Sequence, residues 1–165
     1  MVATRDNEAR RTTVRKTSDR EVVVTRTFDA PARLVFEAWS RPELFRTWWV
    51  PSSMGMTLRS CEMDVRTGGS YRLEFGDDPA NPMAFFGSYL DVVPDKRIVW
   101  TNEESGDAGS VTTVTLEERD GRTLLVMTEL YPTKEALDEA GTGAQDALQE
   151  TFGQLDDVLA ELAAR

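Results

Sequence analysis

The chain has 165 residues, of which 40% are hydrophobic and 29% are charged, so it is long enough to bury the core of one domain. Its net charge of −10 disfavours phosphate backbones as partners, and we expect no nucleic acid to bind the domain. The sequence contains no histidine, which excludes Ser-His-Asp and Cys-His catalytic sets and histidine-ligated metal sites. We expect neither a metal nor another cofactor.

The N-terminal segment differs in charge from the rest of the chain. Residues 1–20 carry six basic and three acidic side chains, a net charge of +3, so residues 21–165 carry −13. We expect residues 1–19 to be a charged, poorly ordered tail rather than an arm that contacts nucleic acid or an anionic membrane. Residues 20–165 are expected to form a single domain.

The lone cysteine and the lack of long apolar runs bear on the compartment. Cys61 cannot form an intramolecular disulfide, which fits a reducing environment. No N-terminal apolar segment resembles a signal peptide, and no run approaches the roughly 18 apolar residues of a membrane helix. We expect a cytoplasmic protein without membrane insertion.

The first predicted elements are a strand and two short helices. Residues 21–28 are β-branched and partly alternating, which favours a strand. Asp29 is placed to cap a helix that runs to Trp39, with Pro31 in its first turn. Ser40 to Glu43 has the pattern of a capping box, which predicts a second short helix ending near Trp48.

The middle of the chain shows only strand and turn signals. Alternating apolar residues and short turns with glycine or proline predict an antiparallel meander. The six predicted strands cover residues 57–65, 70–75, 84–93, 97–102, 110–119 and 122–131.

The end of the chain changes to a helical period. Residues 142–145 again have a capping-box pattern, and residues 134–140 are compatible with a short extra helix. Apolar residues then recur at intervals of three and four, which predicts one amphipathic helix of about twenty residues. They are Leu148, Phe152, Leu155, Leu159 and Leu162.

This order of elements predicts an α+β domain of the helix-grip type. The apolar face of a seven-stranded, curved antiparallel sheet needs a cover, and the C-terminal helix is the only large apolar surface left. Because a twisted sheet and a straight helix do not meet along their whole length, we expect a hydrophobic cavity between them.

Aromatic residues and methionines near this cavity are the candidate ligand contacts, and a purely structural role in the core is the alternative for each. Residues 48 and 49 follow the second short helix, near the expected cavity mouth. The side-chain direction around Phe85-Phe86 is ambiguous. The candidate set is Trp48, Trp49, Met63, Tyr71, Leu73, Phe75, Phe85, Trp100, Leu148 and Phe152, with Met127 as an adaptable filler.

The charged residues carry weaker signals. Asp64 and Arg66, beside the Gly68-Gly69 turn, are interpreted as a structural pair rather than a charged gate. No spacing singles out a catalytic pair among the strand carboxylates, and a solvated sheet face explains them best. These carboxylates are Glu62, Glu74, Asp91, Glu117 and Glu129.

Several motifs together resemble a known superfamily. The chain is similar to SRPBCC (START-like, Bet v 1-like) proteins, and most of all to the branch related to the C-terminal domain of the activator of heat-shock protein 90 ATPase. Residues 62–69 resemble the Met-Asp-x-Arg-x-Gly-Gly motif of that branch. The other matching segments are residues 28–39, 41–43, 48–49, 92–100 and 143–159. The terminal helix departs from the usual pattern, with Ala144 and Ala147 where relatives often have Met and Gly.

The resemblance implies the helix-grip fold, while its members differ in function. The favoured hypothesis is binding of an apolar or amphipathic small molecule in the cavity, with no catalysis required. One alternative is a polyketide-cyclase- or hydrolase-like enzyme in which Tyr71, or a carboxylate such as Glu74, transfers a proton. Another is a chaperone-interacting module. Exposed strand edges would also permit a homodimer, which the high negative charge opposes.

Overall fold

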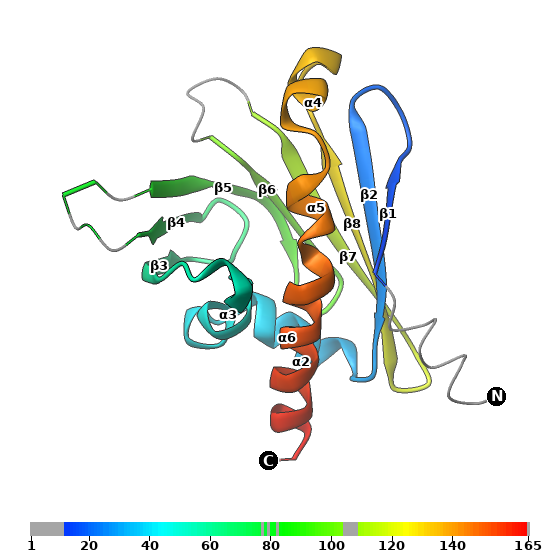
Figure 1. Ribbon diagram of the computed structural model, residues 1–165. Helices are drawn as coiled ribbons and strands as arrows, with labels where there is room; N and C mark the ends of the chain where they lie inside the picture. Colours follow the sequence, from blue (N-terminus) through cyan, green and yellow to red (C-terminus); the bar gives the residue numbers. More distant parts are fainter. Residues whose placement is uncertain (1–11, 77, 79, 82, 104–108, 165) are drawn as a thin grey trace.

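The computed structural model describes residues 12–76, 78, 80–81, 83–103 and 109–164. Within them a curved antiparallel sheet wraps around the C-terminal helices (Figure 1). The strands are β1 (Thr13–Lys16), β2 (Glu21–Phe28), β3 (Leu58–Met63), β4 (Ser70–Phe75), β5 (Met83–Val93), β6 (Arg97–Thr101), β7 (Val111–Arg119) and β8 (Arg122–Leu130). The helices are α2 (Ala32–Ser40), α3 (Pro42–Trp48), α4 (Lys134–Ala140), α5 (Gly143–Asp146) and α6 (Leu148–Ala163), with a 3-10 turn, η1 (Ser52–Met54).

The strands lie in the order β1-β2-β8-β7-β6-β5-β4-β3, and every neighbouring pair is antiparallel. The helix-grip α+β fold is therefore confirmed, but the prediction of seven strands is wrong. An eighth strand, β1, comes from the predicted tail and pairs with β2, with Val14 opposite Val24. The edge strand is short and mostly exposed, so it carries little alternation by which a sequence could reveal it. Residues 1–11 of that tail lie outside the described residues.

The sheet bends at β5, which serves two neighbours. Its first half pairs with β4 and its second half with β6, with an irregular register between Tyr89 and Asp91. Gly87 lies near this change of partner. A Cβ atom there would lie 1.9 Å from the carbonyl oxygen of Thr101, so only glycine allows this approach of two backbones.

The C-terminal segment covers the concave face of the sheet, as Figure 1 shows for α5 and α6. The apolar stripe of α6 is buried as predicted, but the helix is interrupted, because residues 143–146 form the separate turn α5. Arg26 of β2, which is 3% exposed, binds Asp156 of α6 through two hydrogen bonds of 2.8 and 2.5 Å. This bidentate ion pair fixes α6 to the sheet. No helix in the described part of the chain is long and apolar enough to cross a membrane.

The helix starts differ from the predicted capping pattern. The side chains of Asp29, Ser40 and Thr142 do not cap the helices that follow them; the N-cap residues of α2 and α3 are Pro31 and Arg41. In α2 the first backbone N–H, that of Ala32, instead donates to Glu118 Oε1 of β7 at 2.8 Å. A carboxylate distant in the sequence thus replaces the local cap.

Candidate functional site

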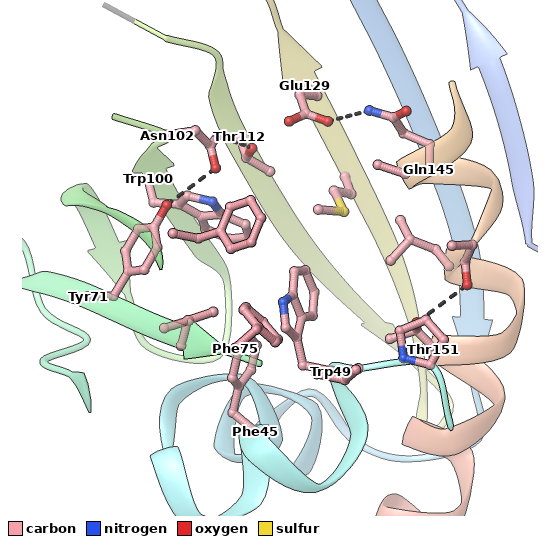
Figure 2. A pocket seen from close by; sticks show the side chains of 18 of the residues that line it. Phe45, Trp49, Tyr71, Phe75, Trp100, Asn102, Thr112, Glu129, Gln145 and Thr151 are labelled. Carbon is pink, nitrogen blue, oxygen red and sulfur yellow. Dashed lines mark hydrogen bonds between the residues drawn. The ribbon is translucent and has the colours of Figure 1, made fainter. Parts of the chain in front are cut away.

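A cavity of about 610 Å³ lies between the sheet and the segment from α5 to the start of α6. Strands β3 to β8 supply one wall, α5 and the first turn of α6 the opposite wall, and α2 with α3 one end (Figure 2). The stretch from Val50 to Met56, which includes η1, contributes Val50, Pro51, Met54 and Met56 to the lining. The walls are mainly aromatic and aliphatic, which suits a ligand with a large apolar surface.

Eight of the ten candidate residues lie on the cavity wall. Strand alternation brings three of them from β4 to the same side, where all three are buried. Phe85 lines the cavity, whereas Phe86 points to the other face, under the guanidinium group of Arg72 at 5.5 Å. The eight are Trp49, Met63, Tyr71, Leu73, Phe75, Phe85, Trp100 and Leu148, and Met127 joins them.

Trp48 and Phe152 do not line the cavity and belong to the core, so their placement on the wall is wrong. Both are fully buried, and the indole N–H of Trp48 donates to the carbonyl oxygen of Ala38 at 3.0 Å. Phe152 packs its edge against Phe28 of β2, with ring centroids 5.4 Å apart. It lies one helical turn beyond Leu148, where the gap between helix and sheet has closed.

An aromatic cluster closes the end of the cavity at α2 and α3. Trp49 stacks on Phe45 with ring centroids 4.9 Å apart, and Trp39 meets the rings of Trp48, Trp49 and Trp100 within 6 Å. Trp39 and Phe45 also line the cavity, although nothing in the sequence pattern distinguishes them from other residues of the amphipathic helices. These rigid rings hold the cavity open on this side.

The opposite end of the cavity carries a polar band, formed by Asn102, Thr112, Glu129 and Gln145 (Figure 2). Asn102 donates to Thr112 Oγ1 at 3.1 Å, and Gln145 donates to Glu129 Oε2. The residues come from the end of β6, from β7 and β8, and from α5. Sequence reasoning missed this band, because the four residues meet only when distant elements pack together.

Glu129 corrects the interpretation of the strand carboxylates as a solvated face. It is half-buried and lines the cavity, where Ser110 Oγ donates to Glu129 Oε1 at 3.2 Å. Burial, and then the negative charge of Glu129, raise the pKa of nearby Tyr131 above its usual value. Glu129 therefore places negative charge at the edge of an apolar space.

The two groups proposed for proton transfer face opposite sides of β4. Tyr71 points to the cavity, and its hydroxyl donates to the carbonyl oxygen of Thr101 at 2.7 Å. Glu74 is paired with Arg72 at 3.1 Å and is not among the lining residues. Tyr89 also lines the cavity, and burial raises the pKa of its phenol. The geometry brings no acid–base pair of Tyr71 and Glu74 together.

The stretch with η1 is attached to α6 by polar contacts at the cavity mouth. Glu150 accepts hydrogen bonds from the backbone N–H of Ser53 at 3.0 Å and from the Ser53 hydroxyl. Gln154 accepts from the N–H of Ser52 at 2.8 Å and donates to the carbonyl oxygen of Val50 at 2.8 Å. These contacts fix one side of the mouth to the helix.

Asp64 and Arg66 form an exposed ion pair of 2.8 Å beside the glycine turn, and neither is among the lining residues. This arrangement matches a structural role. Within the described residues, no group of three or more Cys, Asp or Glu side chains is arranged to hold a metal ion.

Solved structures share the fold. A crystal structure of a Rhodobacter sphaeroides protein matches with a TM-score of 0.80 at 23% identity, covering 92% of this chain and 99% of that one. Proteins from Nitrosomonas europaea and Mycobacterium smegmatis each match with a TM-score of 0.76 at 21% identity. The first match covers 91% of this chain and 100% of the other, and the second covers 92% and 99%. At these identities the likeness establishes the fold alone.

The sequence itself identifies the family. No protein with a curated description is similar enough to match. The sequence pattern of the Activator of Hsp90 ATPase homolog 1-like proteins matches residues 29–160, which include both short helices, strands β3 to β8 and most of α6. The chain therefore belongs to the Activator of Hsp90 ATPase homolog 1-like family of the SRPBCC superfamily.

Proposed function

We propose that the protein binds an apolar or amphipathic small molecule in the cavity between the sheet and the segment α5–α6. The cavity of about 610 Å³ carries this proposal, since small-molecule sites usually measure roughly 300–1,000 Å³ and are mostly apolar. The family supports it, because SRPBCC domains typically bind ligands in this place. No catalytic step is needed for this function.

The walls of the cavity support the same proposal. Rigid aromatic rings from α2 and α3 and the polar contacts of Glu150 fix the walls in place. An apolar ligand would gain dispersion contacts with these walls and would lose contact with water, and both effects favour binding.

The test is a titration with N-phenyl-1-naphthylamine, an uncharged dye that fluoresces strongly in apolar surroundings. We expect saturable binding with a Kd of about 1–10 μM, because no specific polar contact adds to the apolar burial. Ala147 lines the cavity at the junction of α5 and α6, so Ala147→Phe would fill part of the space. This variant should bind the dye at least about tenfold more weakly.

Ala160→Phe is the matched control, since Ala160 lies on the exposed side of the same helix. It should bind the dye as the wild-type protein does, and circular dichroism would confirm that both variants fold. Leu73→Trp, on the opposite wall, provides a second filled cavity if Ala147→Phe is unstable. Absence of saturable binding, or equal binding by the wild-type protein and a folded filled variant, would refute the proposal.

A further inference from the structure

The polar band restricts the kind of polar group that a ligand can carry. The amide nitrogen of Asn102 donates to Thr112 Oγ1 and to the carbonyl oxygen of Ser110, both at 3.1 Å. The amide nitrogen of Gln145 donates to Glu129 and, at 3.0 Å, to the hydroxyl of Tyr131. Both amides thus direct their N–H groups at acceptors of the protein. The band offers a ligand mainly acceptors.

The direction of the Gln145 amide follows from its neighbours. If the amide were turned around, its oxygen would lie against the carboxylate of Glu129, and two acceptors would face each other. Glu129 therefore fixes the donor side of Gln145. The hydroxyl of Tyr71 likewise donates to the carbonyl oxygen of Thr101 at 2.7 Å and lies 3.3 Å from Asn102 Oδ1, so its proton is also directed at acceptors of the protein.

The charged side chain in the polar band is a carboxylate. Among the described residues that line the cavity, Glu129 alone has a charged side chain, and no Lys or Arg is present. Ser110 and Gln145, which are neutral side chains, both donate to its carboxylate. A carboxylate at the edge of an apolar cavity attracts a cation more strongly than one in water, because the surroundings screen it less.

Two features beyond the band favour a cation as well. Several rings line the cavity, Tyr71 and Trp100 beside the band among them, and the faces of aromatic rings attract cations (Figure 2). The whole chain carries a net charge of −10, which raises the local concentration of cations and repels anions. The carboxylate, the rings and the net charge all select against an anionic ligand.

We propose that the ligand is an amphipathic amine, whose apolar body fills the cavity and whose protonated amine donates to Glu129 at the polar band. The proposal rests on the proposed function and narrows it to one chemical class. A protonated amine is a charged donor, and its hydrogen bond to the carboxylate of Glu129 would be stronger than one between neutral groups. A carboxylic acid of the same length would instead bring two negative charges together.

The test compares three probes with the same alkyl chain: decylamine, decanol and decanoate. Each is used below its micelle concentration at neutral pH to displace N-phenyl-1-naphthylamine from the wild-type protein. We expect decylamine to bind at least about tenfold more tightly than decanoate, a difference in binding free energy of about 1.4 kcal/mol. Decanol should bind with an affinity between the two.

Glu129→Gln tests the residue itself. The variant keeps a side chain that can accept from Ser110 but removes the charge, so the difference between decylamine and decanoate should fall to within about threefold. Decanol should bind nearly as before. Glu62→Gln is the matched control, since Glu62 is exposed on β3 and its loss changes the net charge equally. It should retain the full difference.

The outcomes separate this proposal from the function on which it rests. If the dye shows no saturable binding to the wild-type protein, cavity binding itself is refuted. If the dye binds but none of the three probes displaces it, the proposal of an amine ligand is refuted while cavity binding stands. If the probes bind equally, if decanoate binds most tightly, or if Glu129→Gln folds and keeps the wild-type difference, the amine is refuted while cavity binding stands. If Glu129→Gln does not fold, the order of the three probes on the wild-type protein decides.

Discussion

Adjacent tryptophans in α3 and just after it have different surroundings. Trp48 is fully buried and donates its indole N–H to the backbone of α2, whereas Trp49 is half-buried and faces the cavity. Neighbouring residues on a helix point about 100° apart, so a Trp-Trp pair at a helix end can serve the core and the cavity at once. Trp48 holds the two short helices together, and Trp49 forms part of the wall.

This difference predicts unequal costs of the same substitution. Trp48→Phe removes buried volume and leaves the carbonyl oxygen of Ala38 without its indole donor, so it should destabilise the protein by about 2–3 kcal/mol. Trp49→Phe should cost less than about 1 kcal/mol, since the cavity beside it tolerates a smaller ring. Urea unfolding followed by circular dichroism measures both. A larger loss of stability in Trp49→Phe than in Trp48→Phe would contradict the assignment of Trp48 to the core and Trp49 to the cavity wall.

At the scale of single residues, the sequence predicted the strand positions better than the helix positions. Tyr71, Leu73 and Phe75 alternate strictly, so one correct strand fixes all three. Phe152 was misplaced because a helical stripe shows which residues are buried but not where the helix leaves the sheet. Glu129 and Gln145 could not be paired from the sequence, because their contact depends on how α5 packs over β8.

Replacing Gly87 of β5 and Gly153 of α6 by alanine should change the stability in opposite directions. In β5, a Cβ atom on Gly87 would lie 1.9 Å from the carbonyl oxygen of Thr101, and backbone cannot move aside cheaply. Gly87→Ala should destabilise the protein by about 2–4 kcal/mol. In α6, a Cβ atom on Gly153 would meet no atom within 4 Å, and Gly153→Ala should stabilise by about 0.5–1 kcal/mol. Thermal unfolding of both variants measures the sign of each stability change. A Gly87→Ala protein as stable as the wild type would exclude the close approach of Gly87 to the Thr101 carbonyl.

The attachment of the η1 stretch to α6 should depend on pH. Hydrogen bonds from the Ser53 hydroxyl and backbone N–H lower the pKa of Glu150 below its usual 4.5. A carboxyl group with a lowered folded-state pKa contributes fully above its unfolded value, and the contribution is lost as the pH falls through the folded value. The attachment is therefore complete at pH above 4.5 and weakens below it.

Hydrogen exchange followed by NMR measures this effect. The protection factor of the Ser53 amide should be constant above pH 4.5 and fall in more acidic solution. Glu150→Gln should lower the protection and remove its pH dependence, whereas Asp157→Asn, at an exposed position of the same helix, should keep the wild-type profile. Protection in Glu150→Gln that still falls in acid would assign the effect to another group.

The elements themselves were predicted well where their pattern was long. The strands from β2 to β8 and the stripe of α6 follow from alternation and from spacings of three and four. The starts of the helices were predicted less well. In α2 the first backbone N–H donates to the carboxylate of Glu118, a contact between distant parts of the chain that no local pattern shows. Strand β1 has only four residues, too few for an alternation to stand out.

At the scale of the whole molecule, the domain combines a rigid core with a space beside it. The end with α2, α3 and most of α6 is tightly packed, while the sheet curves away from α5 and the first turn of α6 and leaves the cavity. The sequence predicted that such a space exists, because a twisted sheet and a straight helix diverge. Its volume and its polar band depend on packing that no local pattern records.

The decisive measurement is the location of a bound ligand in the protein. The protein would be labelled at its methyl groups, saturated with N-phenyl-1-naphthylamine, and searched by NMR for nuclear Overhauser effects to the dye. If the ligand binds in the cavity, we expect strong effects to Leu73, Ile98 and Met127, which lie on the cavity wall. Effects confined to exposed methyl groups such as those of Leu90 and Leu124, with none from the wall, would contradict binding in the cavity.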